Sequence, residues 1–166
     1  MQIRLIAESE HAAVAALILS VYVDGGFIPA EADYVHQLRD TTSRADDSEV
    51  WVAVEDGRLL GTVTYCPAGS AHRELAQEGE GEFRMLAVDE SVRGRGIGEA
   101  LVRHCLTRSQ AAGDHAMALS TMEEMTGAHR IYERLGFVRT PEKDWTPGRD
   151  VCLWAFRLDY ETRARN

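Results

Sequence analysis

The sequence predicts a mixed α/β fold, in which helices cover both faces of one central sheet. Two apolar runs on either side of Glu55-Asp56-Gly57 are typical of a β-hairpin, so the early strands should pair antiparallel. Strand and helix patterns then alternate from residue 83 to residue 135, and a β-α-β order requires parallel crossover geometry. The predicted sheet therefore contains both kinds of pairing.

The N-terminal part of the chain is predicted to form one strand and two helices. Residues 2–6 alternate between polar and apolar side chains, which indicates a short strand. Residues 8–23 carry Ala, Leu and Val at helical spacing until a pair of glycines ends the helix. A second helix is predicted over 32–44, and the polar cluster 46–48 is predicted to be a loop.

The clearest strand pattern lies in the middle of the chain. Residues 50–54 and 59–65 are predicted to form the two arms of the hairpin. Residues 67–79 are polar and contain glycine, which favours a mobile loop. The apolar pattern of residues 83–88 then resumes a strand.

Helical spacing returns in the C-terminal half. Residues 96–112 form a strongly helical pattern closed by a glycine, and residues 126–135 form a shorter helix with a similar end. Three further strands are predicted, at 117–121, 137–139 and 151–158. The segment between the last two strands, which contains Trp145, is predicted to be a loop.

Size, charge and composition exclude several classes of protein. A chain of 166 residues is predicted to form a single domain over 1–160 with a short tail at 161–166. The net charge of −9 argues against nucleic-acid binding, which requires a basic face. No stretch is apolar enough to span a membrane, and the N-terminus lacks an apolar signal segment. The three cysteines are far apart and lack Cys-x-x-Cys pairing, which predicts no disulfide and no metal site and favours a cytoplasmic location.

Residues 93–98, Arg-Gly-Arg-Gly-Ile-Gly, form the segment that most strongly suggests ligand binding. Glycines let a backbone approach a ligand closely, and free N–H groups at a helix start attract a phosphate or pyrophosphate. Arg93 and Arg95 would add charge-assisted contacts. The glycine spacing fits neither the Walker A loop nor the Gly-x-Gly-x-x-Gly fingerprint of dinucleotide-binding folds. The alternative is a glycine-rich loop and helix start without a ligand.

The spacing Arg93-x-x-Gly96-x-Gly98 resembles the signature of the GCN5-related N-acetyltransferases, the GNAT superfamily. Met85-Leu86-Ala87-Val88 is similar to the family's strand before this loop, and Ala128-x-x-x-Tyr132-x-x-x-Gly136-Phe137 is similar to its C-terminal helix and turn. The motifs occur in the family's order, and the resemblance extends from about Ile3 to Leu158. It implies a mostly antiparallel mixed sheet in which two parallel strands splay apart.

The resemblance implies acetyl-CoA as co-substrate, bound where the strands at 83–88 and 117–121 part. Backbone groups of the first strand would pair with the pantetheine arm, and the Leu86 N–H would polarise the thioester carbonyl. Met125 stands where many members carry an Asn that helps to hold this arm. The residues implied in cofactor binding are Leu86, Ala87, Val88, Arg93, Gly94, Arg95, Gly96, Ile97 and Gly98.

Two side chains are predicted to move protons in such a reaction. The resemblance makes Tyr132 the acid for the departing thiolate, the alternative being a tyrosine that is buried only for packing. Glu82 matches the glutamate base of some GNAT histone acetyltransferases, and alternation would place it on one face with Arg84 and Leu86. The alternatives are that Glu82 belongs only to the acidic run 78–82, or that a water chain removes the amine proton.

The predicted function is transfer of an acetyl group from acetyl-CoA to a primary amine of a small molecule or peptide, by direct attack in a ternary complex. The alternative is a non-catalytic acyl-CoA-binding or sensing module with the same fold. A homodimer is possible, since dimers are common in the family. Candidates for the acceptor pocket, each with an equally good packing explanation, are Tyr22, Asp24, Phe27, Tyr34 and Trp145.

Overall fold

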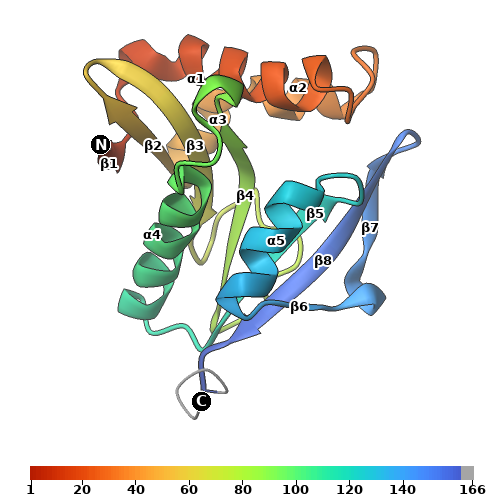
Figure 1. Ribbon diagram of the computed structural model, residues 1–166. Helices are drawn as coiled ribbons and strands as arrows, with labels where there is room; N and C mark the ends of the chain where they lie inside the picture. The colour runs from red at the N-terminus through yellow and green to blue at the C-terminus, as the bar shows by residue number, and fades with distance from the viewer. Residues whose placement is uncertain (162–166) are drawn as a thin grey trace.

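The computed structural model describes residues 1–161 and places one eight-stranded sheet at the centre of the molecule (Figure 1). The strands lie in the order β1-β2-β3-β4-β5-β8-β6, and β7 pairs with β8. They are β1 (Gln2–Leu5), β2 (Glu49–Glu55), β3 (Arg58–Cys66), β4 (Glu80–Val88), β5 (Ala116–Met122), β6 (Val138–Arg139), β7 (Trp145–Gly148) and β8 (Val151–Asp159). Only β4 and β5 run parallel among these described pairs, which confirms the mixed sheet. Residues 162–166 of the predicted tail lie outside the described residues.

Helices of different lengths connect the strands. The α-helices are α1 (His11–Leu19), α2 (Tyr34–Arg39), α3 (Thr41–Asp47), α4 (Ile97–Ala111) and α5 (Thr126–Leu135). The short turns are η1 (Glu8–Glu10), η2 (Ser20–Asp24), η3 (Glu90–Val92) and η4 (Pro141–Lys143). The helices predicted at 96–112 and 126–135 are confirmed as α4 and α5. Gly136 ends α5 at φ 98°, a backbone angle that favours glycine.

The helix predicted over 8–23 consists of three parts. A 3-10 turn, η1, leads into α1, and α1 continues into η2, which is a π turn. A π turn closes with i→i+5 hydrogen bonds and so holds more residues than an α-helical turn. The wider turn places the Tyr22 side chain inside the molecule, where it is buried.

The second predicted helix, over 32–44, is broken at Asp40 (φ −84°, ψ 67°) into α2 and α3. The Asp40 carboxylate accepts an N–H from the first turn of α3, as a helix N-cap does. The buried Arg44 guanidinium donates to carbonyls at the end of α2. Because α3 continues to Asp47, the loop predicted at 46–48 is wrong.

Two strand boundaries also differ from the prediction. The strand expected at 83–88 begins at Glu80, because β4 already pairs there with Ala116 of β5. The segment around Trp145 is not a loop but strand β7, in which Trp145 faces Leu153 of β8. This pairing brings the Trp145 ring to the centre of the sheet.

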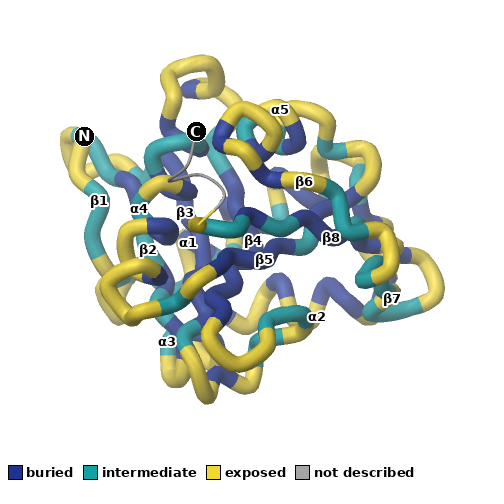
Figure 2. Tube along the Cα trace, turned by 90° about the horizontal axis from the view of Figure 1, so that it is seen from below, coloured by how far each residue is buried: buried dark blue, intermediate teal, exposed yellow. Residues whose placement is uncertain are grey.

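The sheet has a separate apolar core on each face. Helices α4 and α5 cover one face, where they pack with Phe83 and Leu86 of β4. Elements α1, η2 and α2 cover the other face, where they pack with Met85 and Ala87. Figure 2 shows β4 and β5 mostly buried between these layers, while β1 and β6 are more exposed. No helix within residues 1–161 is both long and apolar enough to cross a membrane.

Candidate active site

The parallel strands β4 and β5 part in the middle of the sheet. They pair only from Glu80 with Ala116 to Phe83 with Leu119. Beyond this point β5 keeps its pairing with β8 as far as Met122. Among the described residues, no strand pairs with positions 84–88 of β4 on the β5 side. The splayed strand pair implied by the sequence resemblance is therefore present.

A bulge lies in β4 just beyond the point of separation. Met85 has φ 57°, which is uncommon for a residue other than glycine. The pairing with β3 shifts at the same place, because a single β3 residue lies between the partners of Arg84 and Ala87. Leu86 consequently packs on the α4 and α5 face, whereas Arg84 bonds to α2 on the opposite face. The prediction that Glu82, Arg84 and Leu86 share one face is wrong, because the bulge interrupts the alternation.

The carbonyl of Leu86 is bound by a side chain from the N-terminal half. The Tyr22 hydroxyl donates to it at 3.0 Å, and this bond is buried. Burial raises the pKa of Tyr22 well above its usual value, so the hydroxyl keeps its proton at neutral pH. Tyr22 thus fixes the backbone at the position where the sequence predicts the oxyanion donor.

The loop at 93–98 leads directly into α4. Gly94 and Gly96 have φ of 84° and 78°, so the turn uses the conformational freedom that glycine provides. No side chain caps the N-terminus of α4, which leaves the N–H groups of its first turn available to a ligand. The Arg95 guanidinium binds both carboxylate oxygens of Glu55, at 2.8 and 3.0 Å, whereas Arg93 is exposed.

Tyr132 lies on α5 with its ring inside the core. Its side chain is 3% exposed and packs against Phe83, Phe137 and Phe156. Burial raises the pKa of Tyr132 above its usual value, although a hydrogen bond with Thr121 opposes this effect. Tyr132 is therefore protonated at neutral pH, as a proton donor must be.

Glu82 is fully buried and holds the loop that precedes β4. Its carboxylate accepts the backbone N–H groups of Glu74, Leu75 and Ala76 at 3.1, 2.7 and 2.9 Å. A buried carboxylate needs such donors to replace water. Glu82 thus anchors the loop through these hydrogen bonds, in addition to the base role predicted for it.

The loop predicted to be mobile, 67–79, is fastened to α3 as well. The His72 imidazole lies 2.7 Å from the Asp47 carboxylate, and the Ser70 hydroxyl lies 2.7 Å from that of Ser48. The Asp47 carboxylate also accepts the N–H of Ala71 at 2.7 Å. These bonds and the Glu82 anchor give the loop a defined position.

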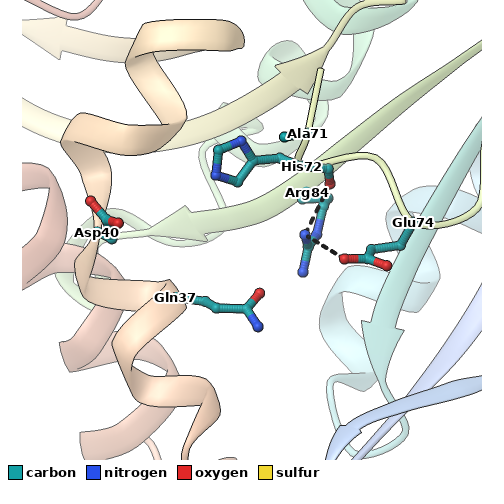
Figure 3. A pocket seen from close by; sticks show the side chains of 6 residues that line it. All are labelled: Gln37, Asp40, Ala71, His72, Glu74 and Arg84. Atoms are coloured by element: carbon teal, nitrogen blue, oxygen red, sulfur yellow. Dashed lines mark hydrogen bonds and ion pairs between the residues drawn. The ribbon is translucent and has the colours of Figure 1, made fainter. Parts of the chain in front are cut away.

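A cavity of about 260 Å³ opens between this loop, α2 and β4 (Figure 3). It lies on the α1 and α2 face of the sheet, opposite Tyr132. This polar lining was not predicted from the sequence, because its residues come from three distant segments of the chain. The charged Arg84 within an otherwise apolar strand was the one feature of the sequence that could have indicated it. The lining residues are Gln37, Asp40, Ala71, His72, Glu74 and Arg84.

Arg84 connects this cavity to the parted strands. Its guanidinium donates to the Tyr34 hydroxyl at 2.9 Å and to the His72 carbonyl at 3.0 Å. It also lies over the Trp145 ring, 5.6 Å from the ring centre. Trp145 in turn donates to the Ser120 hydroxyl of β5 at 2.9 Å.

The structure brings together three of the residues predicted for the acceptor pocket. Tyr34 and Trp145 contact Arg84, and Tyr22 is near enough to Tyr34 and Tyr132 for both to raise its pKa. Phe27 is half-buried against the second core, and its backbone N–H donates to the Tyr22 carbonyl at 3.1 Å, but no side-chain hydrogen bond or ring contact described for residues 1–161 joins it to this group. Asp24 is exposed to solvent.

Known proteins share this sequence pattern. The model of the acetyltransferase (GNAT) family matches residues 14–137. N-acetylaspartate synthetase of Rattus norvegicus is 36% identical over 115 residues, which make up 68% of this chain and 36% of the relative. Mycothiol acetyltransferase of Cellulomonas flavigena is 34% identical over 122 residues, or 67% of this chain and 35% of the relative. The chain thus spans about a third of the length of these curated relatives.

Solved structures share the fold. A GNAT-family acetyltransferase of Staphylococcus aureus Mu50 superposes with a TM-score of 0.77 at 16% identity, covering 96% of this chain and 98% of that one. A structure from Salmonella typhimurium, solved with its cofactor acetyl-CoA, superposes with a TM-score of 0.65 at 19% identity and covers 96% of this chain and 94% of that one. At these identities the likeness concerns the fold alone.

The family match covers most of the chain, including β4, the glycine loop and α5. The parted strands and the uncapped helix α4 lie within the same segment. The chain therefore belongs to the acetyltransferase (GNAT) family.

Proposed function

We propose that this protein is an N-acetyltransferase that transfers the acetyl group of acetyl-CoA to a primary amine of a small molecule or peptide. The observation that carries the proposal is the separation of β4 from β5 beside the uncapped N-terminus of α4. The names of the relatives support the proposal, because they include an N-acetylaspartate synthetase and two acetyltransferases.

The residues of this chain fit an acyl-CoA. The unpaired β5-facing edge of Leu86, Ala87 and Val88 suits an extended pantetheine arm, which would add to β4 as a strand does. The amides from Arg93 to Gly98, with two glycines at positive φ, suit a pyrophosphate. A side chain at position 98 would meet Ile131 at 3.0 Å, so Gly98 lets α4 approach α5 closely.

Two groups would stabilise charge in the reaction. The amine electron pair forms the new C–N bond, the C–S bond breaks, and its electrons leave on sulfur. The N–H of Leu86 would bind the carbonyl oxygen as it becomes negative, an effect typically worth roughly 10²–10³ in rate. Tyr132 would give its proton to the sulfur.

The amine must also lose a proton. Glu82 stays the predicted base, although its oxygens already bind the loop amides. The imidazole of His72 is a second candidate, because it lines the cavity and the Asp47 carboxylate at 2.7 Å orients it. A cytoplasmic location, a homodimer and the absence of a metal stay predictions.

A thermal-shift titration with acetyl-CoA, with NADPH as control, tests the cofactor. We expect saturable stabilisation by acetyl-CoA alone, and then release of free thiol when an accepted amine is added. Absence of a shift contradicts the proposal. Saturable binding without thiol release across a broad amine panel favours the alternative, a non-catalytic acyl-CoA sensor.

A further inference from the structure

We infer that the acceptor is an amine that also carries a carboxylate, as an amino acid does, and that Arg84 binds this carboxylate. The inference rests on the proposed N-acetyltransferase function and adds the chemical class of its acceptor. It is carried by the place of Arg84 in β4, the partners of its guanidinium and the cavity beside it.

Arg84 stands where the two parallel strands begin to part. Phe83 is the last β4 residue that pairs with β5, and Arg84 follows it directly. Two residues of fully extended strand span roughly 7 Å, so across the bulge at Met85 the backbone of Leu86 begins no further than this from that of Arg84. A small amino acid can bridge that distance, with its carboxylate at the guanidinium and its amine near the predicted oxyanion donor.

The guanidinium is buried without a hydrogen-bonded carboxylate. Arg84 is 3% exposed, and its two described hydrogen bonds go to neutral oxygens, the Tyr34 hydroxyl and the His72 carbonyl. A buried cation is strongly unfavourable unless it is paired, and the ion pair described for Arg84 within residues 1–161 is the long contact with Glu74, at 3.9 Å, that Figure 3 draws. Burial by itself lowers the pKa of Arg84, but Tyr34 and Glu82 outweigh it and raise that pKa, so the side chain stays charged.

Two neighbouring carboxylates, of Glu82 and Glu74, leave the Arg84 guanidinium without a carboxylate hydrogen bond. The Glu82 oxygens accept N–H groups of the loop. Glu74 comes no closer than 3.9 Å, beyond hydrogen-bond distance, and its side chain is 38% exposed. Because Glu74 is exposed and loosely held, a ligand carboxylate can displace it and form the two parallel hydrogen bonds that a guanidinium favours.

The cavity next to Arg84 suits a small polar acceptor. Its volume of about 260 Å³ lies below the range typical of pockets for drug-sized ligands. Gln37 and His72 add polar groups to the lining, as Figure 3 shows. The cavity also lies on the sheet face opposite Tyr132, so an acceptor there would approach the thioester from the side away from the departing sulfur.

Matched acceptors test the inference on the full chain. Each pair consists of an amino acid and its carboxamide, for example alanine with alaninamide and aspartate with aspartic diamide. The carboxamide has the less basic amine, so a larger fraction of it is unprotonated and able to attack at neutral pH, and a preference for the acid must come from the protein. We expect kcat/KM for acids to exceed that for amides by about 10–100-fold, the strength of a charge-assisted contact.

Variants then assign the preference to Arg84. Arg84→Met should remove it mainly through KM while the acetyl-CoA affinity stays within twofold, and Arg84→Lys should retain part of it. Glu74→Gln should lower KM for acids severalfold, because the competing carboxylate is gone. Arg108→Met removes an arginine that pairs with Glu49 outside the cavity, and it should keep the preference.

If Arg84→Met does not fold, Arg84→Lys and Glu74→Gln still test whether Arg84 binds the acceptor carboxylate. The inference is overturned if the wild type has an equal or higher kcat/KM for the amides, or if the preference for acids survives Arg84→Met. Acetyl-CoA binding with transfer only to neutral amines overturns it while the proposed function stands. Failure to bind acetyl-CoA overturns the proposed function, which the thermal-shift titration reads separately.

Discussion

The Tyr22 hydroxyl donates to the Leu86 carbonyl across 64 residues of sequence, and this bond ties the π turn η2 to the bulge in β4. The carbonyl belongs to Leu86, the first residue of the strand edge that we propose for acyl-CoA binding. The helical layer therefore fixes the strand at the point where the chemistry is proposed to occur.

Tyr22→Phe should weaken both the fold and the reaction. The change leaves the buried Leu86 carbonyl without its donor, so we expect the free energy of unfolding to fall by about 1–3 kcal/mol. The kcat should fall because the Leu86 N–H is less well positioned. Denaturant titration and steady-state kinetics measure the two effects. Tyr65→Phe, which removes a 3.3 Å bond to Asp114, is the control and should leave kcat unchanged.

Tyr132→Phe should reduce turnover without loss of cofactor binding. We expect kcat to fall by about 10²-fold, the usual worth of a proton donor, with the acetyl-CoA Kd within twofold. Because burial raises the pKa of Tyr132 above its usual value of 10.0, wild-type kcat should show no fall from tyrosine ionisation up to pH 10. A variant that keeps full turnover would exclude Tyr132 as the acid.

Glu82→Gln separates a base from a loop anchor. Gln offers one acceptor oxygen where the carboxylate has two, so we expect a loss of about 1–3 kcal/mol in unfolding free energy and faster proteolysis within 67–79. If Glu82 is also the base, the loss in kcat should shrink as pH rises, since the amine then deprotonates in solution. A loss independent of pH would contradict the base role. His72→Gln, measured over the same pH range, tests the second candidate.

Arg93→Ala should weaken acetyl-CoA binding more at low salt than at high salt. An exposed charge contact is screened as ionic strength rises. Arg95→Ala is the matched variant, and its effect should be smaller because Glu55 already binds that guanidinium. Isothermal titration at two salt concentrations gives the comparison. A larger effect of Arg93→Ala at high salt would argue against contact with a phosphate.

Glu80 should contribute stability that disappears in acid. Burial by itself raises the pKa of Glu80. The hydrogen bonds that its carboxylate accepts from Arg157, at 2.6 Å, and from the Gln77 N–H have the larger combined effect, so the pKa of Glu80 is lowered from the usual 4.5. The contribution is therefore complete above pH 4.5 and is lost as pH falls below that value. Glu80→Gln should be less stable than wild type by about 2 kcal/mol at pH 7 and closer to it at pH 3.5. A difference that does not change with pH would contradict this origin.

Glycine and strand patterns made the centre of the fold predictable. The conformation of the loop at 93–98 follows from its own residues, because Gly94 and Gly96 adopt backbone angles that other residues avoid. The hairpin and the α4 and α5 helices likewise follow from short-range periodicity. The break at Asp40 was missed because Asp within an apolar helical pattern gives no sign that its carboxylate will start a new helix.

The acceptor side of the site could not be predicted from local sequence patterns. Met85 adopts φ 57° without being glycine, so the bulge that separates Arg84 from Leu86 has no sequence signal. The cavity joins α2, the loop before β4 and β4 itself, and only the folded chain brings these segments together. Glu82, predicted as a base from its place in the strand, has loop amides as partners that strand periodicity does not reveal.

The π turn at Ser20–Asp24 makes the end of the first helix less regular. Removing one residue from it would let α1 continue as a regular helix, which is the more favourable backbone. The same deletion would rotate Tyr22 by about 100° around the helix axis and away from Leu86. A single-codon deletion would thus gain helix regularity and lose the support of β4, so a more regular backbone at this turn would come with a less firmly held strand edge.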